Sequence, residues 1–166
     1  MHDTLTGAGS RTVQASAGGR ALPGAGSEFG GVDPSPRDRA FIALQSAYRP
    51  HGGISRSHCL AVGGASASDR ARRIDELVDD HQLFRFQWHH DWWLPLFQLD
   101  KAGPSLATAP RRVIAELGDA FDGWAMAIWF VQPNSWLEGH SPIERLEANL
   151  PDVLAAARAD RFVATA

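Results

Sequence analysis

The stretch from Phe121 to Val131 constrains the fold of this chain more than any other part of the sequence. Its apolar residues recur at the spacing of one face of an α-helix, and the positions between them are apolar as well. A helix that is apolar nearly all round must be buried on most of its sides. The stretch is too short to cross a bilayer, which takes about 20 apolar residues. It therefore predicts the central helix of a small domain, with other helices packed around it.

Composition and charge limit the class of protein. With 166 residues, of which 44% are hydrophobic, the chain supports one domain or two small ones that share a core. The formal net charge of −3 argues against a wholly basic nucleic-acid-binding protein. Cys59 is the only cysteine, so an intrachain disulfide and a thiolate metal cluster are both excluded. Because no signal peptide or membrane-spanning run is evident, we expect a cytoplasmic protein.

The composition divides the chain into three segments. Residues 1–35 are rich in glycine, alanine and serine and have almost no large apolar side chains, so they predict a disordered tail. Residues 36–103 predict helices followed by a β-hairpin. Residues 104–166 predict a C-terminal helical domain. The expected fold is mainly α, a small helical bundle with one β-hairpin.

Three helices are predicted in the first part of this bundle. The first covers about residues 37–48 and is followed by a proline and a glycine pair. Residues 54–61 lie between two glycine pairs and predict a second, short helix. A third helix begins at Ser66 or Ser68, since either side chain can cap it.

The periodicity then becomes two-fold. Large aromatic residues occupy every second position over residues 84–88, as in a half-buried strand. A polar break at residues 89–91 and a second β-rich run over residues 92–99 complete a predicted hairpin. Pro95 cannot donate to a ladder, so we expect it at an edge or a bulge. Three short helices followed by a hairpin is the order of elements in a winged helix, which makes this half winged-helix-like by analogy.

Local start and stop signals predict the helices of the C-terminal domain. Pro110 opens a helix that ends at Gly118. After the central helix, Asn134 can cap a single turn. The segment Ser141-Pro142-Ile143-Glu144 is a capping box with proline at the first helical position. Pro151 opens the last helix.

Sequence signals for catalysis and for metal binding are weak. No nucleotide-binding phosphate loop occurs. The densest group of possible metal ligands is His81, His89, His90 and Asp91. Adjacent residues of a strand point to opposite faces, and no HExxH spacing is present, so we interpret this group as a solvated hairpin tip. We therefore expect a protein that is not an enzyme and needs no metal or cofactor.

The six tryptophans are more informative, although most of them must belong to the core. Trp92 and Trp93 are consecutive on a predicted strand, so one indole is exposed unless both faces of the strand are covered. Trp136 follows Pro133-Asn134 in a loop, where it is either exposed or closes the base of the bundle. Exposed aromatic residues favour a protein interface.

The C-terminal half also carries a pattern that is typical of a known family. The residues that carry it are the helix Trp124–Phe130, Pro133-Asn134, Leu137, Gly139, Pro142, Leu146 and the pair Val153-Leu154. This pattern resembles the Xre/MbcA/ParS toxin-binding antitoxin domain. The predicted hairpin, with its run Leu94–Leu99, and the helix after Pro110 are similar to the upstream half of the same family. The resemblance covers residues 36–163 and is strongest over residues 121–154.

The resemblance implies an antitoxin that binds and occludes a RES-domain toxin, which is an enzyme that degrades NAD. In such pairs the helical domain docks on the toxin, and its C-terminal end blocks the active site. Carried over to this sequence, the toxin-binding residues are Trp136, Glu138, Arg158, Asp160, Arg161 and Phe162. The last four match no fixed motif and are placed by position alone.

The chain departs from the family in one respect, since no Xre-type recognition helix is evident between residues 37 and 80. Binding of DNA at its own promoter is therefore left open, as is the formation of a homodimer. The alternative function is a winged-helix-like DNA-binding transcriptional regulator. It would use Arg70, Arg72 and Arg73, which lie near the positive end of a predicted helix and could meet an anionic partner there.

Overall fold

The computed structural model describes residues 33–60, 66–101 and 105–166. The disordered tail predicted for residues 1–35 lies outside the described residues except for residues 33–35. Residues 34–166 form one compact unit. Within the described part of the chain, no helix is long and apolar enough to cross a membrane.

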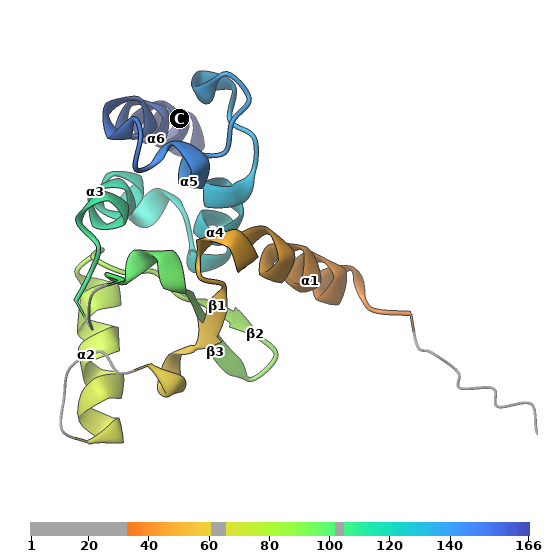
Figure 1. Cartoon of the computed structure of the whole chain (residues 1–166), viewed down its shortest axis with the longest axis vertical. Coiled ribbons are helices and arrows are strands. Elements are labelled where there is room, and N and C mark those ends of the chain that lie inside the picture. The colour runs from red at the N-terminus through yellow and green to blue at the C-terminus, as the bar shows by residue number, and fades with distance from the viewer. Residues whose placement is uncertain (1–32, 61–65, 102–104) are drawn as a thin grey trace, which may run out of the picture. The chain divides into compact units, whose positions relative to one another are not determined.

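The described part of this unit consists of six α-helices and a three-stranded antiparallel sheet (Figure 1). The helices are α1 (Pro36–Tyr48), α2 (Ala67–Asp79), α3 (Thr108–Leu117), α4 (Gly123–Val131), α5 (Pro142–Arg145) and α6 (Leu150–Thr165). The strands are β1 (Ile54–Arg56), β2 (Phe86–Trp88) and β3 (Asp91–Pro95), in the sheet order β1-β3-β2. The predicted fold class, mainly α with one β-hairpin, is confirmed.

Residues 54–61, which were predicted to form a short helix, contain a strand instead. Ile54–Arg56 form β1, which pairs antiparallel with β3, and a 3-10 turn follows at Ser57–Cys59. The prediction was wrong because β1 forms only by pairing with β3, which lies about 40 residues further along the chain, and local sequence signals do not show such a partner. A short segment between glycine pairs cannot nucleate a stable helix by itself, and β pairing supplies the backbone hydrogen bonds that it lacks.

The hairpin is confirmed, with β2 and β3 paired through Phe86↔Trp93 and Gln87↔Trp92. Because β1 pairs with the other side of β3, β3 is the central strand rather than an edge strand. Pro95 is nevertheless accommodated, since it is the last residue of β3 and its missing N–H falls where the ladder ends.

Helix α4 lies in the larger apolar core, as predicted. It begins two residues later than expected because the side chain of Asp122 caps it by accepting a hydrogen bond from the backbone N–H of Ala125 at 2.7 Å. The ring centroid of the fully buried Phe130 lies 5.7 Å from that of Phe84 and 4.8 Å from that of Phe97. The hairpin region and the C-terminal helices therefore share this core.

The sheet separates this core from a second, smaller apolar cluster. On one face, Trp93 packs against α1, with its ring centroid 5.0 Å from that of Phe41. On the other face, the fully buried Leu94 belongs to a cluster with Ile74 of α2. Both faces of β3 are therefore covered over this part of the strand.

Tyr48 joins α1 to α4. Its side chain is fully buried, and its hydroxyl donates a hydrogen bond to the backbone carbonyl of Ala127 at 2.7 Å. Burial raises the pKa of Tyr48 well above its ordinary value, so the hydroxyl stays protonated and keeps donating. The other end of α1 is fixed by a capping box between Ser35 and Asp38.

Candidate functional site

Three large apolar side chains in the C-terminal half are exposed to solvent, and we call them the C-terminal apolar group. They are Trp136, Phe162 and Val163, with exposed fractions of 62%, 74% and 71%. Trp136 lies in a 3-10 turn, Ser135–Leu137, between α4 and α5, and the other two lie near the end of α6. Trp136 therefore does not close the base of the bundle, because the neighbouring Leu137 is the buried residue of this turn.

The loop that carries Trp136 is held in one conformation by its own hydrogen bonds. The side-chain oxygen of Asn134 accepts from the backbone N–H of Trp136 at 2.9 Å, as the predicted cap requires. The backbone N–H of Asn134 donates to the carbonyl of His140 at 3.0 Å, and that of Gly139 donates to the carbonyl of Asn134 at 3.0 Å. Glu138 and Gly139 both adopt left-handed backbone conformations, with φ of 57° and 81°.

Asp160 fastens this loop to α6. One of its carboxylate oxygens accepts a hydrogen bond from the indole N–H of Trp129 at 2.7 Å and another from the side-chain N–H of Asn134 at 2.7 Å. Asp160 was predicted as a toxin-binding residue, but the structure places it in this partly buried network. Its role here is to position the loop that carries Trp136. Asn134 was predicted only as a helix cap, and no local signal indicated its hydrogen bond to Asp160.

Arg158 and Arg161, also predicted to bind a toxin, are turned toward α3. The Arg158 side chain lies 3.1 Å and the Arg161 side chain 3.5 Å from the carboxylate of Glu116. Arg161 also donates to the backbone carbonyl of Glu116 at 2.9 Å. Since both guanidinium groups remain about half exposed, they can still contact a partner while they hold α6 on α3.

Glu138 and Phe162 are the most accessible of the predicted site residues. The Glu138 carboxylate lies 4.0 Å from Arg145, and its side chain is almost fully exposed. Phe162 follows the last residue that is tied to α3, and every residue from there to the end of the chain is exposed. The structure thus brings Trp136, Asn134 and Asp160 into one connected region. Phe162 lies two residues after Asp160 on α6.

The arginines of the alternative DNA-binding site lie on α2. Arg72 pairs with Asp69 at 2.6 Å, and Arg73 pairs with Glu76 at 3.1 Å, each within the same helix. Arg70 is half-buried. The helix also contains more acidic residues than basic ones, namely Asp69, Asp75, Glu76 and Asp79. The potential at this surface is therefore not strongly positive.

The consecutive tryptophans of β3 differ in environment. Trp93 is half-buried between α1 and Arg56, whose guanidinium carbon lies 5.4 Å from the ring centroid. Trp92 lies on the opposite face and is 43% exposed, with the guanidinium of Arg85 4.5 Å above its ring. Arg85 is in turn paired with Asp75 of α2 at 2.7 Å. The exposed indole of this strand is therefore partly covered by a stacked cation.

The histidines of the possible metal site lie apart. The ring nitrogen of His81 lies 2.8 Å from the carboxylate of Asp119, and that of His89 lies 3.2 Å from Asp38. Among the described residues, no group of three or more potential ligands could hold a metal ion. His89, next to His90, adopts a left-handed backbone conformation with φ of 51°, as the tight hairpin turn requires.

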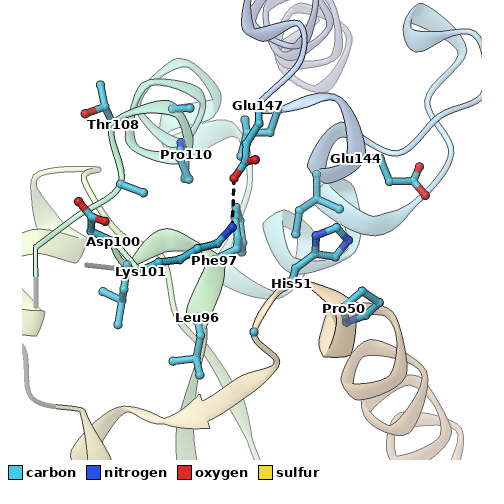
Figure 2. Close-up of a pocket in the computed structure, with 16 residues that line it drawn as sticks. Pro50, His51, Leu96, Phe97, Asp100, Lys101, Thr108, Pro110, Glu144 and Glu147 are labelled. Carbon is cyan, nitrogen blue, oxygen red and sulfur yellow. Dashed lines mark ion pairs between the residues drawn. The ribbon is translucent and has the colours of Figure 1, made fainter. Parts of the chain in front are cut away.

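A pocket of about 680 Å³, which the sequence did not predict, opens between α3, α5 and the segment after β3 (Figure 2). Its apolar lining includes Leu96, Phe97 and Leu99, together with Ile143 and Leu146. No local signal could have indicated it, because its walls come from segments that are distant in the sequence.

Comparisons with known protein families, with curated proteins and with solved structures find no match to this chain. The fold and the surface define a mainly α domain with exposed apolar side chains on a loop and at the end of its last helix.

Proposed function

We propose that the chain is a cytoplasmic, non-enzymatic antitoxin that binds a RES-domain toxin and occludes the active site where the toxin degrades NAD. The observation that carries the proposal is the exposure of Trp136, Phe162 and Val163 on two elements that Asp160 ties together. Tryptophan is among the commonest energetic anchors of protein interfaces. Burying one large apolar side chain against a partner stabilises a complex by about 1.5–3 kcal/mol. The exposed side chains can therefore contribute to the affinity for a partner.

The residues that carry the family resemblance support the same function. Asn134 and Gly139 belong to the hydrogen-bonded loop that presents Trp136, and Pro142 follows it at the start of α5. These residues therefore fix the conformation of the loop that carries the exposed indole of Trp136. A rigid anchor loses little conformational entropy when a partner binds it.

Two parts of the molecule supply different roles in this proposal. The loop with Trp136 docks on the toxin, and the end of α6 blocks its active site. Residues 162–166 extend beyond Arg161, the last residue of α6 with a side-chain bond to α3, and all of them are exposed. This exposed part of α6 is therefore available to contact a partner.

A DNA-binding regulator is the less supported alternative. Its arginines on α2 are paired with acidic residues of the same helix, so fewer free cations are available to neutralise phosphates. We expect binding to promoter DNA to be weak, and homodimer formation is not needed for the proposed role.

The test measures NAD turnover by a RES-domain toxin encoded beside this chain, with the antitoxin in excess. A chain that ends at Arg161 keeps the Asp160 network and the pairing with Glu116, so it should fold and still bind the toxin. It should lose inhibition, because nothing then fills the active site. The matched control is Ile42→Ser, which removes an apolar side chain of 52% exposure from α1 and should inhibit as wild type does.

Two results would contradict the proposal. Full inhibition by the chain that ends at Arg161 would show that the helix end does not block the active site. Failure of the intact chain to bind a neighbouring RES-domain enzyme, together with salt-sensitive binding to its own promoter, would favour the DNA-binding alternative.

A further inference from the structure

The pocket between α3 and α5 has preformed walls. The segment after β3 is held by hydrogen bonds from the Leu96 N–H to the Gly53 carbonyl and from the Ala107 N–H to the Gln98 carbonyl, each at 2.9 Å. The start of α5 is held by the Glu144 carboxylate, which accepts from the Ser141 backbone N–H at 2.9 Å. These bonds do not depend on a ligand, so the cavity exists before anything binds, as in most small-molecule sites.

The base of the pocket is apolar and incompletely covered. Ile143 and Leu146 are buried, but Leu96, Phe97 and Leu99 are only half-buried although they surround a space of about 680 Å³. This volume falls in the usual range of small-molecule pockets, roughly 300–1,000 Å³. An apolar group placed here would remove further carbon surface from water, which favours binding by about 25 cal/mol per Å².

The rim of the pocket carries more negative than positive charge. Among the lining residues, Lys101 is the only lysine or arginine, His51 is the only histidine, and Asp100, Glu144 and Glu147 are carboxylates. The Glu144 carboxylate caps α5 and points away from the pocket (Figure 2), so Glu147 is the carboxylate that meets Lys101 at the opening. The formal charge of the lining therefore favours a cation over an anion at the rim.

One ion pair spans the opening. Lys101 and Glu147 reach toward each other across the pocket, with Nζ and Oε1 3.5 Å apart (Figure 2). Both side chains are almost fully exposed, so their pairing is weak and easily broken. A bound cation could therefore replace Lys101 as the partner of Glu147.

We propose that this pocket binds a small organic cation with an apolar body, such as an aromatic amine. The apolar body rests on Phe97, Ile143 and Leu146, and the ammonium group takes the place of Lys101 beside Glu147. This site is independent of the proposed antitoxin activity, because none of its lining residues belongs to the C-terminal apolar group.

The test compares ligands that share one ring and differ in charge. Tryptamine, tryptophan and indole-3-propionate are titrated into the full chain, and amide resonances are followed by NMR. Tryptamine should cause saturable shifts at Phe97, Leu99, Ile143 and Leu146, and indole-3-propionate should bind at least about tenfold more weakly. Equal or tighter binding of either carboxylate ligand, or no saturable shift with tryptamine up to about 10 mM, would overturn the proposal.

Variants of the charged residues distinguish binding that depends on the charge of the pocket from non-specific binding. Glu147→Gln should weaken tryptamine binding and Lys101→Met should tighten it, each by up to about fivefold, since both side chains are exposed. Glu76→Gln is the matched control, because it removes the same charge from an exposed ion pair on α2 and should leave binding unchanged. Equal effects of Glu147→Gln and Glu76→Gln would show that the pocket has no role.

Discussion

Gln98 is a buried polar side chain that holds the hairpin region together. Its side-chain oxygen accepts from the Phe84 backbone N–H at 2.8 Å, and its side-chain nitrogen donates to the carbonyls of Phe84 and Pro95, each at 3.0 Å. Buried polar groups are tolerated when they are hydrogen-bonded in this way. The side chain thus replaces strand pairing for a segment that precedes β2.

Removing these bonds should be strongly destabilising. Gln98→Leu leaves three buried backbone groups without a partner and should lower the free energy of unfolding by about 3 kcal/mol or more. Urea unfolding at neutral pH measures the difference. A loss below about 1 kcal/mol would show that water or a shifted backbone satisfies these groups.

The variant Gln98→Glu tests the same hydrogen bonds through the pH dependence of stability. In Gln98→Glu only the protonated side chain can donate to a carbonyl, so folding raises the pKa of the new carboxyl. Its stabilising contribution is present below the unfolded value, about 4.3, and is lost as pH rises through the folded pKa. A protonated carboxyl has a single O–H and serves only one of the two carbonyls, so a deficit relative to wild type remains near pH 4 and should be larger at pH 7.

Gly123 marks a close approach of α4 to the start of β2. A Cβ atom at this position would lie 1.8 Å from the backbone carbonyl oxygen of Arg85. Gly123→Ala should therefore push the two segments apart and lower the free energy of unfolding by about 3 kcal/mol or more. The control is Gly139→Asn, which has open space and a residue type that tolerates positive φ, and it should change stability by less than about 1 kcal/mol. Similar melting temperatures for Gly123→Ala and wild type would contradict the close packing.

At the scale of elements, helix caps and the hairpin were predictable from local signals, whereas the long-range pairing of β1 with β3 was not. The caps at Ser66, Asn134 and Ser141 were predictable because each acts on backbone groups only a few residues away. Strand β1 was missed because β3, its partner, lies far along the chain. The same reason hid the role of Asp160, whose donors Trp129 and Asn134 belong to other elements.

The capping box of α5 should make part of the stability of the fold depend on pH in the acid range. The Ser141 backbone N–H and hydroxyl bond the Glu144 carboxylate and lower its pKa below the ordinary value of 4.5. Its contribution to stability is therefore present above the unfolded pKa and is lost as pH falls through the folded pKa. Because the group is exposed, the effect should stay below about 1 kcal/mol.

Glu144→Gln tests this sign. Its stability deficit relative to wild type should be present at pH 7 and should disappear at low pH, where the wild-type carboxyl is protonated. Glu147→Gln, an exposed residue three positions further on, should show a smaller pH-dependent difference because it caps no helix. A Glu144→Gln deficit that does not vary with pH would contradict the capping explanation.

For the whole molecule, the sequence indicated the central helix and the hairpin, because these depend on apolar periodicity and turn chemistry, and it left the exposure of Trp136 open. It could not show that Asp160 and Arg161, which were predicted to bind a toxin, also fasten α6 to its neighbours. The pocket beside α5 needs three distant segments to be folded together, so no local pattern could reveal it.

Trp136 should matter for docking on the toxin rather than for the stability of the fold. Because Trp136 is 62% exposed, Trp136→Ala should change the free energy of unfolding by no more than about 0.5 kcal/mol. If its indole anchors the toxin, the same change should weaken binding by about 2 kcal/mol, or roughly 30-fold. Calorimetry with the RES-domain toxin measures the affinity, and thermal melting checks the fold. Trp92→Ala removes an indole of 43% exposure from β3 and serves as the matched control, with no loss of affinity expected. Equal losses in the two variants would mean that the toxin does not recognise the loop between α4 and α5.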